Sequence, residues 1–434
     1  MKKMMMMTLL LILTVQVFAG GMVTNSNQSA EYMRTLNRNA SVGLDAVYFN
    51  PAAVAGLGQG LHLYLSNQTI SQTRTVEADF PTYNNNSWSG ETFAPAFPNL
   101  HVAYVTGSLA FSASFQPIGG GGTAEFPAGL PAFEKDLAVF SNGVPAALLN
   151  PALESLGNFN GYSVDAAFNG SSLYLGFQGN FSYALSEMIQ AGIGVRYISA
   201  KNTYEGGLEN IVLKTTSGTD LTAAIAGERL ADKFVEAEKT GSAMVFILSA
   251  NMQLTKQINA SLRYETKGAL EMTNSTITDD VDMFPDGVVT HSDIPAQFSF
   301  GLGWQEGLTR VEVSADYWFN TAVDWDGKEE KVDNNYEAGV GVEFGLTESL
   351  VISGGYLYAV TGARDEYQTD LDFSLSSNTV AFGGKYILSD KKYVSLGLFD
   401  TIYMEGQNYA PIPFNQERYM KTSIGFAVGY SHDF

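Results

Sequence analysis

Apolar and polar residues alternate with a period of two through most of the chain after residue 58. In "QFSFGLGW", Phe298, Phe300 and Leu302 share one face, while Ser299 and Gly301 take the other. The stretches "RVEVSADYW", "EAGVGVEF" and "NASLRYET" repeat the pattern. This period predicts β-strands with one apolar and one polar face. Alternation alone does not say whether the apolar face fills a soluble sandwich or faces lipid.

Fourteen segments carry the strand pattern and are separated by turn-forming residues. We expect strands at 59–68, 98–105, 108–118, 171–184, 187–201, 241–254, 257–272, 294–305, 308–319, 333–345, 348–360, 376–388, 391–404 and 418–434.

The connections between these strands alternate between short and long. Tight turns are expected at Thr106-Gly107, Leu185-Ser186, Thr255-Lys256, Glu306-Gly307, Leu346-Thr347 and Ser389-Asp390. The other connections have roughly a dozen to about fifty residues, and such sorting is typical of outer-membrane barrels. An even strand count places both termini on the short-turn side. The chain also ends on an aromatic residue, Phe434, as barrels of this class usually do.

Composition supports a barrel that faces lipid. Charged residues make up 16% of the chain, against about 25% in an ordinary soluble domain. Aromatic residues reach 12%, and no later segment has the ~18 consecutive apolar residues of a spanning helix. The net charge of -21 argues against a nucleic-acid partner, and the absence of cysteine excludes disulfides and a lipoprotein anchor. A large secreted β-protein is the remaining alternative.

The first nineteen residues read as a secretory signal. Lys2 and Lys3 precede an apolar run from Met4 to Val15, and small residues stand at the cleavage positions. The run is too short for a spanning anchor. We therefore expect residues 1–19 to be removed and the mature chain to reside in the outer membrane of a Gram-negative bacterium.

Residues 20–57 precede the first strand and contain no long alternating run. A barrel of fourteen strands leaves a lumen that side chains alone do not fill. A compact apolar segment on the periplasmic side is well placed to fold into that lumen as a plug. An ordinary turn before the first strand is the alternative for its centre, Asn50-Pro51.

The stretch "NASVGLDAVYFNPAAVAGL" resembles the hatch of the outer-membrane long-chain fatty-acid transporters, the FadL type with its toluene-transport relatives such as TodX. The matching hatch residues include Asp45, Phe49, Asn50, Pro51 and Ala52. The resemblance implies a hatch over 20–57 and a monomeric all-β transmembrane barrel of fourteen antiparallel strands over 58–434. It also implies uptake of hydrophobic small molecules, with membrane lipid as the other partner.

The third strand, "LAFSASFQPIGGGGT", loses its alternation at its outer end. Gln116 and Pro117 interrupt the pattern, and Gly119 and Gly120 begin a run of four glycines. Proline removes a ladder hydrogen bond, so the strand either ends or kinks there. The resemblance favours a kink that opens a lateral gate for exit into the membrane. We expect Asn50 of the hatch to face this gap.

Two long loops carry apolar segments that we expect to form short amphipathic helices. They are "LPAFEKDLAVF" and "VPAALLNPALESL" in loop 119–170, and "DLTAAIAGERLADKFVEAEK" in loop 203–240. Helices that cap the barrel mouth are as well supported by the pattern as a substrate groove. The groove candidates are Phe133, Leu137, Phe140, Leu148 and Leu149.

Charged residues on the polar strand faces predict an ion-paired lumen, in which Arg196 and Arg263 are candidates to meet a carboxylate substrate. The acidic loops lack the aspartate spacing of known calcium sites, so we expect no metal and no cofactor. His291-Ser292 is not a catalytic dyad, and no nucleophile elbow is present, so we expect no catalytic residues. A general diffusion porin and, less favoured, an outer-membrane lipase-type enzyme are the alternative functions.

Overall fold

The computed structural model describes residues 29–409 and 416–434. The expected signal sequence, residues 1–19, and the first part of the expected hatch, residues 20–28, lie outside the described residues.

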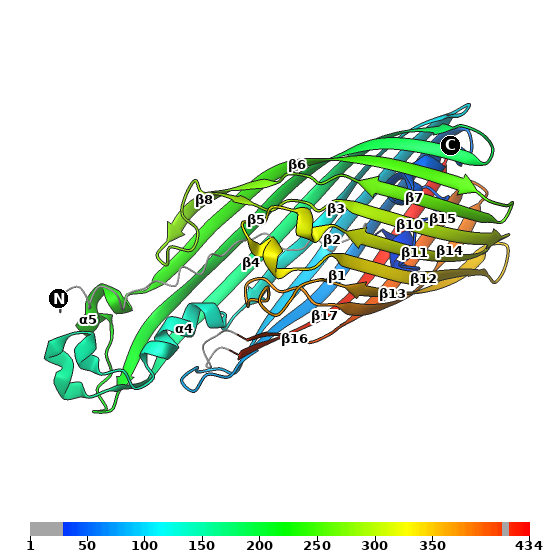
Figure 1. Ribbon diagram of the computed structural model, residues 1–434. Helices are drawn as coiled ribbons and strands as arrows, with labels where there is room; N and C mark the ends of the chain where they lie inside the picture. Colours follow the sequence, from blue (N-terminus) through cyan, green and yellow to red (C-terminus); the bar gives the residue numbers. More distant parts are fainter. Residues whose placement is uncertain (1–28, 410–415) are drawn as a thin grey trace.

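Fourteen antiparallel strands close into a barrel, which confirms the predicted count and fold class (Figure 1). The last wall strand pairs with the first from His62–Asp433 to Ala78–Glu417, so the sheet has no free edge at this seam. The wall strands are β1 (Gly60–Ala78), β2 (Ser87–Thr106), β3 (Leu109–Phe126), β4 (Phe159–Ala184), β5 (Ile189–Thr215), β6 (Lys233–Gln253), β7 (Ile258–Glu265), β10 (Gln297–Glu306), β11 (Thr309–Trp318), β12 (Asn335–Gly345), β13 (Leu350–Val360), β14 (Ser377–Ser389), β15 (Lys392–Tyr403) and β17 (Gln416–Asp433).

Three short strands extend this wall at the long-loop end. β8 (Glu271–Asp279) pairs with β6 beyond the end of β7, and β9 (Val289–His291) pairs with β8. β16 (Gly406–Tyr409) pairs with β17 beyond the end of β15. The single strand predicted at 257–272 was therefore wrong in detail, because residues 266–270 interrupt it.

The strands β1 to β6 are much longer than predicted, whereas β10 to β13 end close to their predicted bounds. β4 and β5 have 26 and 27 residues, against 10 or 11 in β10 to β13. The outer parts of the long strands project beyond the rest of the barrel toward the long loops (Figure 1). Their alternation is weak in the sequence because these parts rise above the apolar band of the wall.

The helices predicted in loop 203–240 were largely wrong. Only α5 (Ala223–Ala226) and the 3-10 turn η4 (Gly227–Leu230) form there, and β6 already begins at Lys233. The segment Lys233–Lys239 pairs with β5 on one side and β8 on the other, so its backbone bonds favour a strand over a helix. In loop 119–170, α4 (Pro131–Phe140) forms as predicted. "VPAALLNPALESL" forms only the 3-10 helices η2 (Ala146–Leu148) and η3 (Pro151–Leu156).

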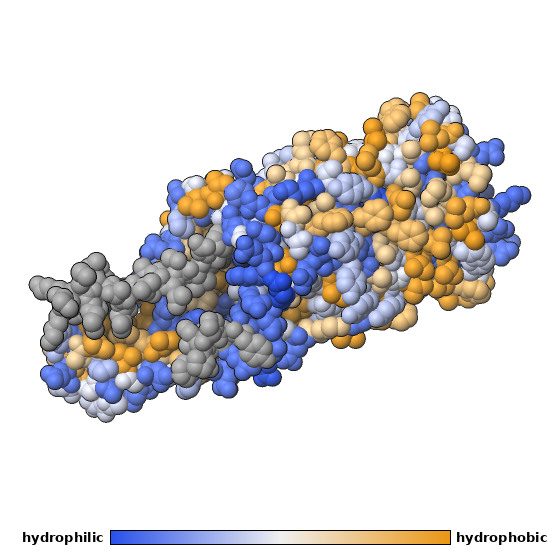
Figure 2. All heavy atoms as spheres, in the orientation of Figure 1, coloured by the Kyte–Doolittle hydropathy of each residue, from blue (hydrophilic) through white to orange (hydrophobic). Residues whose placement is uncertain are grey.

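The apolar strand faces point outward, which excludes a soluble sandwich with an apolar interior. Phe298 and Phe300 are 41% and 38% exposed, while Ser299 between them is 1% exposed. Hydrophobic residues cover much of the wall toward the short-turn end, and hydrophilic residues gather near the middle of the molecule (Figure 2). An apolar exterior over a polar interior is the pattern of a transmembrane barrel. Among the described residues, no helix is long and apolar enough to cross a membrane.

Residues 29–57 lie in the lumen at the short-turn end (Figure 1). They form α2 (Ala30–Met33), α3 (Ala46–Phe49) and the 3-10 helix η1 (Pro51–Gly56), and most of their side chains are buried. The backbone of Ala52 donates to Ser249 Oγ of β6 at 2.9 Å, and that of Ala40 donates to Glu312 of β11 at 2.7 Å. The segment therefore contacts inward-facing residues on more than one strand of the wall.

Candidate functional site

A cavity of about 710 Å³ lies in the lumen above the N-terminal segment. Tyr32, Met33 and Leu36 line it from the segment, and residues 367–375 of the β13–β14 loop line it from the outer end. Aromatic residues of β4, β5 and β15 mix with polar residues in the rest of the lining. Such a mixed, largely preformed space fits a small molecule with an apolar body and a few polar atoms.

The wall beside this cavity is broken between β2 and β3. Residues pair from Thr106–Leu109 to Leu100–Phe115 and again at Thr92–Ala124 and Glu91–Glu125, but not between. On its other side, β3 pairs with β4 with shifts after Pro117 and after Gly120. Gln116, Pro117 and Gly119 are buried, while Gly120, Gly121 and Gly122 line the cavity. The expected kink is present, and its glycines face the lumen.

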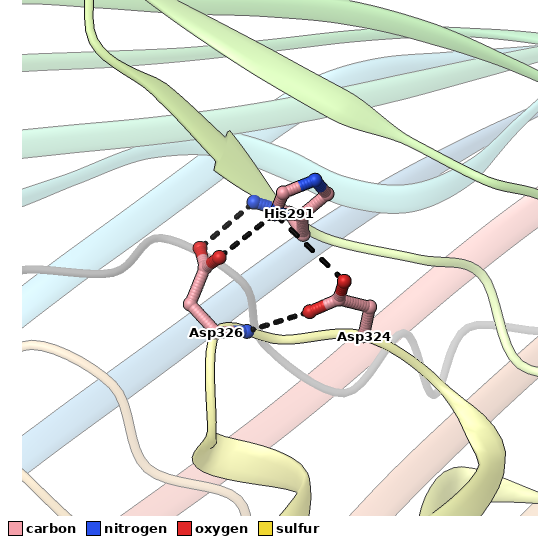
Figure 3. Close-up of side chains that lie close together, drawn as sticks. All are labelled: His291, Asp324 and Asp326. Atoms are coloured by element: carbon pink, nitrogen blue, oxygen red, sulfur yellow. Dashed lines mark hydrogen bonds and ion pairs between the residues drawn. The ribbon is translucent and has the colours of Figure 1, made fainter.

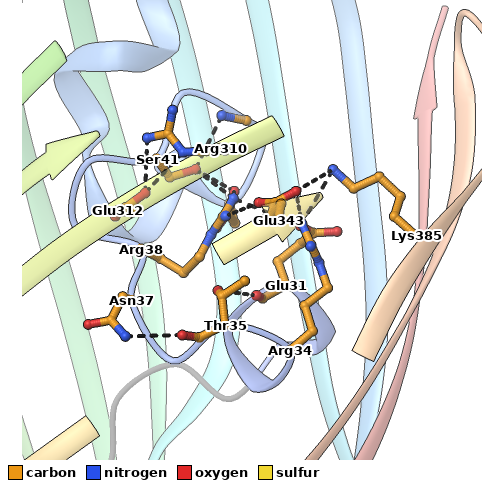
Figure 4. A network of polar contacts seen from close by, with 12 residues as sticks. Glu31, Arg34, Thr35, Asn37, Arg38, Ser41, Arg310, Glu312, Glu343 and Lys385 are labelled. Carbon is orange, nitrogen blue, oxygen red and sulfur yellow. Dashed lines mark hydrogen bonds and ion pairs between the residues drawn. The ribbon is translucent and has the colours of Figure 1, made fainter. Parts of the chain in front are cut away.

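The N-terminal segment is fastened to the wall by buried charges (Figure 4). Arg34 contacts Glu31 at 2.5 Å and Glu343 of β12 at 3.0 Å. Arg38 contacts Asp45 at 2.5 Å and Glu343 at 3.0 Å. Burial acts to raise the pKa of the Asp45 carboxyl, but the charge and hydrogen bonds of Arg38 outweigh it and lower this pKa to about 2. The two pairs with Glu343 join the segment to β12 and hold it in one place.

The hatch-motif residues form its structural centre. The Asn50 side chain donates to the Ser41 carbonyl and to Asn251 Oδ1 of β6, both at 3.0 Å. The Pro51 carbonyl accepts from Ser182 Oγ of β4 at 2.6 Å, and the Phe49 ring stacks on Tyr32 with centroids 5.6 Å apart. The expectation that Asn50 faces the gap beside β3 was wrong. The turn of η1 directs this side chain toward β6 instead.

The two lumen arginines singled out from the sequence are engaged with protein groups. Arg196 pairs with Glu265 at 2.6 Å, and Arg263 donates to the Tyr48 carbonyl at 2.7 Å. Both guanidinium groups also lie over the Tyr48 ring. They lie beside the N-terminal segment, and neither lines the cavity.

Two basic residues on the wall strands, which the sequence reasoning missed, line the cavity. Arg74 of β1 and Lys421 of β17 are directly opposite in register. Arg74 lies over the Phe373 ring at 4.2 Å, and Lys421 lies over the Tyr403 ring at 4.7 Å. In the described part of the chain, neither forms an ion pair with a carboxylate. Strand parity places both inward, but only closure of β1 on β17 makes them neighbours.

The groove candidates lie at the long-loop end of the barrel. Phe133, Leu137, Phe140 and Leu149 pack against an apolar cluster on the outer parts of β4 and β5, while Leu148 is exposed. Glu134 on the buried face of α4 accepts from Tyr162 at 2.7 Å and Trp88 at 3.2 Å, and burial raises its pKa. Four of the five candidates therefore contribute to a cap, and Leu148 alone presents a large apolar surface.

His291, Asp324 and Asp326 lie together on the outer loops (Figure 3). His291 Nδ1 lies 2.8 Å from Asp326 Oδ1 and 3.9 Å from Asp324 Oδ2. The hydrogen bond to Asp326 is the main cause of a raised His291 pKa. The group links β9 to the β11–β12 loop as an ion pair on the surface.

Solved structures share this fold. The chain is similar to a Pseudomonas aeruginosa FadL homologue, with 14% identity, a TM-score of 0.67, and coverage of 96% of this chain and all of that chain. It is also similar to the toluene transporter TodX of Pseudomonas putida, with 15% identity, a TM-score of 0.60, and coverage of 90% and 94%. The toluene transporter TbuX of Ralstonia pickettii gives 15% identity and a TM-score of 0.56, with coverage of 90% and 94%. No family model and no curated protein sequence matches the chain.

Proposed function

We propose that this protein is an outer-membrane channel that takes up hydrophobic small molecules and releases them sideways into the membrane. The observation that carries the proposal is the break between β2 and β3, where Gly120, Gly121 and Gly122 line the lumen cavity. A molecule in the cavity is therefore next to an interrupted ladder of the fourteen-strand wall. Apolar surface gains roughly 25 cal/mol per Å² on leaving water, so exit into lipid is downhill.

The shared fold supports the same class of cargo. The similar structures include proteins named as toluene transporters and as a FadL homologue. The apolar exterior of the wall suits the outer membrane of a Gram-negative bacterium, and the barrel closes within one chain, as expected for a monomer. Long-chain fatty acids and hydrocarbons are the proposed substrates.

The cavity favours a substrate that carries an acid group. Arg74 and Lys421 face each other across the β1–β17 pair and contact aromatic rings. Two like charges directly opposite in a sheet repel each other, so a carboxylate between them would relieve that repulsion. We therefore place long-chain fatty acids ahead of uncharged hydrocarbons.

A general diffusion porin is the second candidate, and the lumen argues against it. Residues 29–57 fill the short-turn end through buried ion pairs, whereas a porin leaves a water-filled passage. The residues around the cavity contact one another as ion pairs and packed rings, and we propose transport rather than catalysis.

A disulfide across the break tests the lateral route. A Cβ atom on Gly122 would lie 3.2 Å from Ala94 Cβ, just under the Cβ separation of about 3.5–4.5 Å in disulfides, and the φ of +93° at Gly122 adds some backbone strain to the bridge. Because the chain has no cysteine, an A94C/G122C variant contains only the intended pair. We expect oxidation to reduce uptake of a labelled long-chain fatty acid to the level of cells lacking the protein, and reductant to restore it.

A matched disulfide on the intact wall is the control. Ala315 of β11 and Ala338 of β12 are register partners on the outer face, so A315C/A338C should bridge without changing uptake. Uptake that persists when the A94C/G122C bridge is complete would favour an axial route. Straightening β3 by substitution is a poorer test, because a Cβ on Gly120 would lie 2.2 Å from the Ser172 carbonyl oxygen.

A further inference from the structure

An irregularity in β2 turns one aromatic side chain into the break. Thr92 and Ala94 are buried and face inward, and by strict alternation residue 97 would face outward like Phe93. However, the β1–β2 register shifts between Gln68–Phe97 and Ile70–Ala94, so Pro95 and Ala96 together oppose Thr69 alone. This bulge reverses the parity of β2. Phe97 is 6% exposed as a result, whereas Phe93 is 67% exposed.

Side chains of β1 hold the bulge in place. Asn67 Nδ2 and Thr69 Oγ1 donate to the Pro95 carbonyl at 3.2 and 2.9 Å. Asn67 Oδ1 accepts from the Phe97 backbone N–H at 3.0 Å. These bonds replace ladder bonds that the bulge removes, so the inward direction of Phe97 is built into the wall.

The Phe97 ring fills the space left by a glycine of β3. A Cβ on Gly121 would lie only 1.7 Å from Phe97 Cζ, and the φ of Gly121 is +129°. Gly121 lines the lumen cavity. On the outer face of the same strands, Leu100 and Phe115 line a shallow hollow of about 420 Å³. Phe97 therefore lies in the unpaired stretch, against a glycine that lines the inner cavity and three residues before Leu100, which lines the outer hollow.

We propose that the Phe97 ring is the gate of the lateral exit and limits the width of the molecules that pass. The inference rests on the proposed uptake function and adds a specificity-determining residue to it. No ladder pair joins β2 to β3 over residues 93–99 and 116–123. The Phe97 ring can therefore turn aside without breaking ladder pairs between the two strands. A wider substrate requires a larger displacement of the ring and passes more slowly.

Uptake of a narrow and a wide probe by the full-length protein tests the gate. The probes are a straight-chain fatty acid and a fatty acid that ends in a pyrene group, with variants compared at equal surface levels. We expect Phe97→Ala to raise pyrene-acid uptake about tenfold relative to the straight-chain acid, the effect of removing ~1.4 kcal/mol from a barrier. We expect Phe97→Trp to lower the same ratio. Phe93→Ala, on the outer face of the same strand, is the matched control and should leave it unchanged.

The possible outcomes separate the gate from the uptake function. Wild-type uptake of both probes with an unchanged ratio in F97A and F97W would overturn the gate and leave the uptake function standing. If the wild type takes up neither probe, both the gate and the uptake function are overturned. The gain in pyrene-acid uptake in F97A must also disappear when A94C and G122C form a disulfide in the same chain. If the gain persists, the gate lies elsewhere. If F97A fails to assemble, F97W and Phe97→Leu carry the same comparison.

Discussion

The inner and outer halves of the lumen differ in how their basic residues are satisfied. At the short-turn end, Arg34, Arg38 and Arg310 each contact a carboxylate at 3.0 Å or less. At the outer end, Arg74 and Lys421 lie opposite each other and contact aromatic rings. Both sets point into the same barrel, but only the first is neutralised by the protein.

This difference separates structural charges from charges available to a ligand. A buried charge costs several kcal/mol of desolvation unless a partner compensates it. The inner arginines have such partners, so they fasten the N-terminal segment and have little left to offer a substrate. The outer pair has no carboxylate partner among the described residues, and it lies in a cavity lined partly by aromatic rings, where an acid can approach it. Counting lumen cations in the sequence does not reveal this division.

The largest expected effect comes from displacing the N-terminal segment, which carries the inner arginines Arg34 and Arg38. A Cβ on Gly355 of β13 would lie 1.9 Å from the Thr35 carbonyl oxygen of the N-terminal segment. We expect Gly355→Leu to expel the segment while the wall strands stay bonded to one another, since barrel stability rests on inter-strand bonds. Ion conductance in planar bilayers should then rise well above that of the wild type.

The neighbouring glycine provides the control for this experiment. Gly354 faces the outside of the barrel, where an added Cβ meets only ordinary contacts, at 3.5 Å and beyond. Gly354→Leu should therefore conduct like the wild type. Equal conductance of G355L and the wild type, with both folded by heat-modifiable migration, would show that the segment does not block the lumen.

A smaller effect is expected from removing the two outer basic groups, Arg74 and Lys421. The double variant R74M/K421M keeps much of the apolar volume and removes both charges. We expect uptake of a long-chain fatty acid to fall about tenfold, or ~1.4 kcal/mol, while uptake of a long-chain alkane stays unchanged. Arg418→Met on the same strand is the control, because Arg418 is exposed and pairs with Glu77 at 2.7 Å. Equal losses of fatty-acid and alkane uptake would show that Arg74 and Lys421 do not recognise the acid group.

The smallest effect concerns the pH dependence of conductance, through the ion pair between Asp45 and Arg38 in the N-terminal segment. The folded pKa of Asp45 is about 2, below its ordinary 3.8. A lowered carboxyl pKa means that its stabilisation is fully present above ~pH 4 and is lost as the pH falls toward 2. Conductance should rise across this window as the segment loosens. Asp45→Asn should reduce this rise in conductance at low pH. If the rise is unchanged in the variant, other carboxylates cause it.

The sequence predicted the wall well because a strand's pattern is local. The six tight turns and the fourteen strands follow from period-two alternation and turn residues. The N-terminal motif marked a compact segment, and residues 29–57 occupy the lumen. The kink at Pro117 was visible because proline and glycine act on the backbone wherever they stand. The outer ends of β1 to β6 were missed because they leave the apolar band that makes alternation readable.

What only the tertiary structure decided is which residues meet. Asn50 contacts β6 instead of the break, and Arg196 and Arg263 serve the N-terminal segment rather than the cavity. Arg74 and Lys421 are 347 positions apart and become neighbours only when β1 closes on β17. Phe97 turns inward only because β2 bulges against β1. Alternation determines the two faces of each strand, but register, closure and bulges determine which face is inside and what stands opposite. These depend on contacts between strands that no single segment of sequence contains.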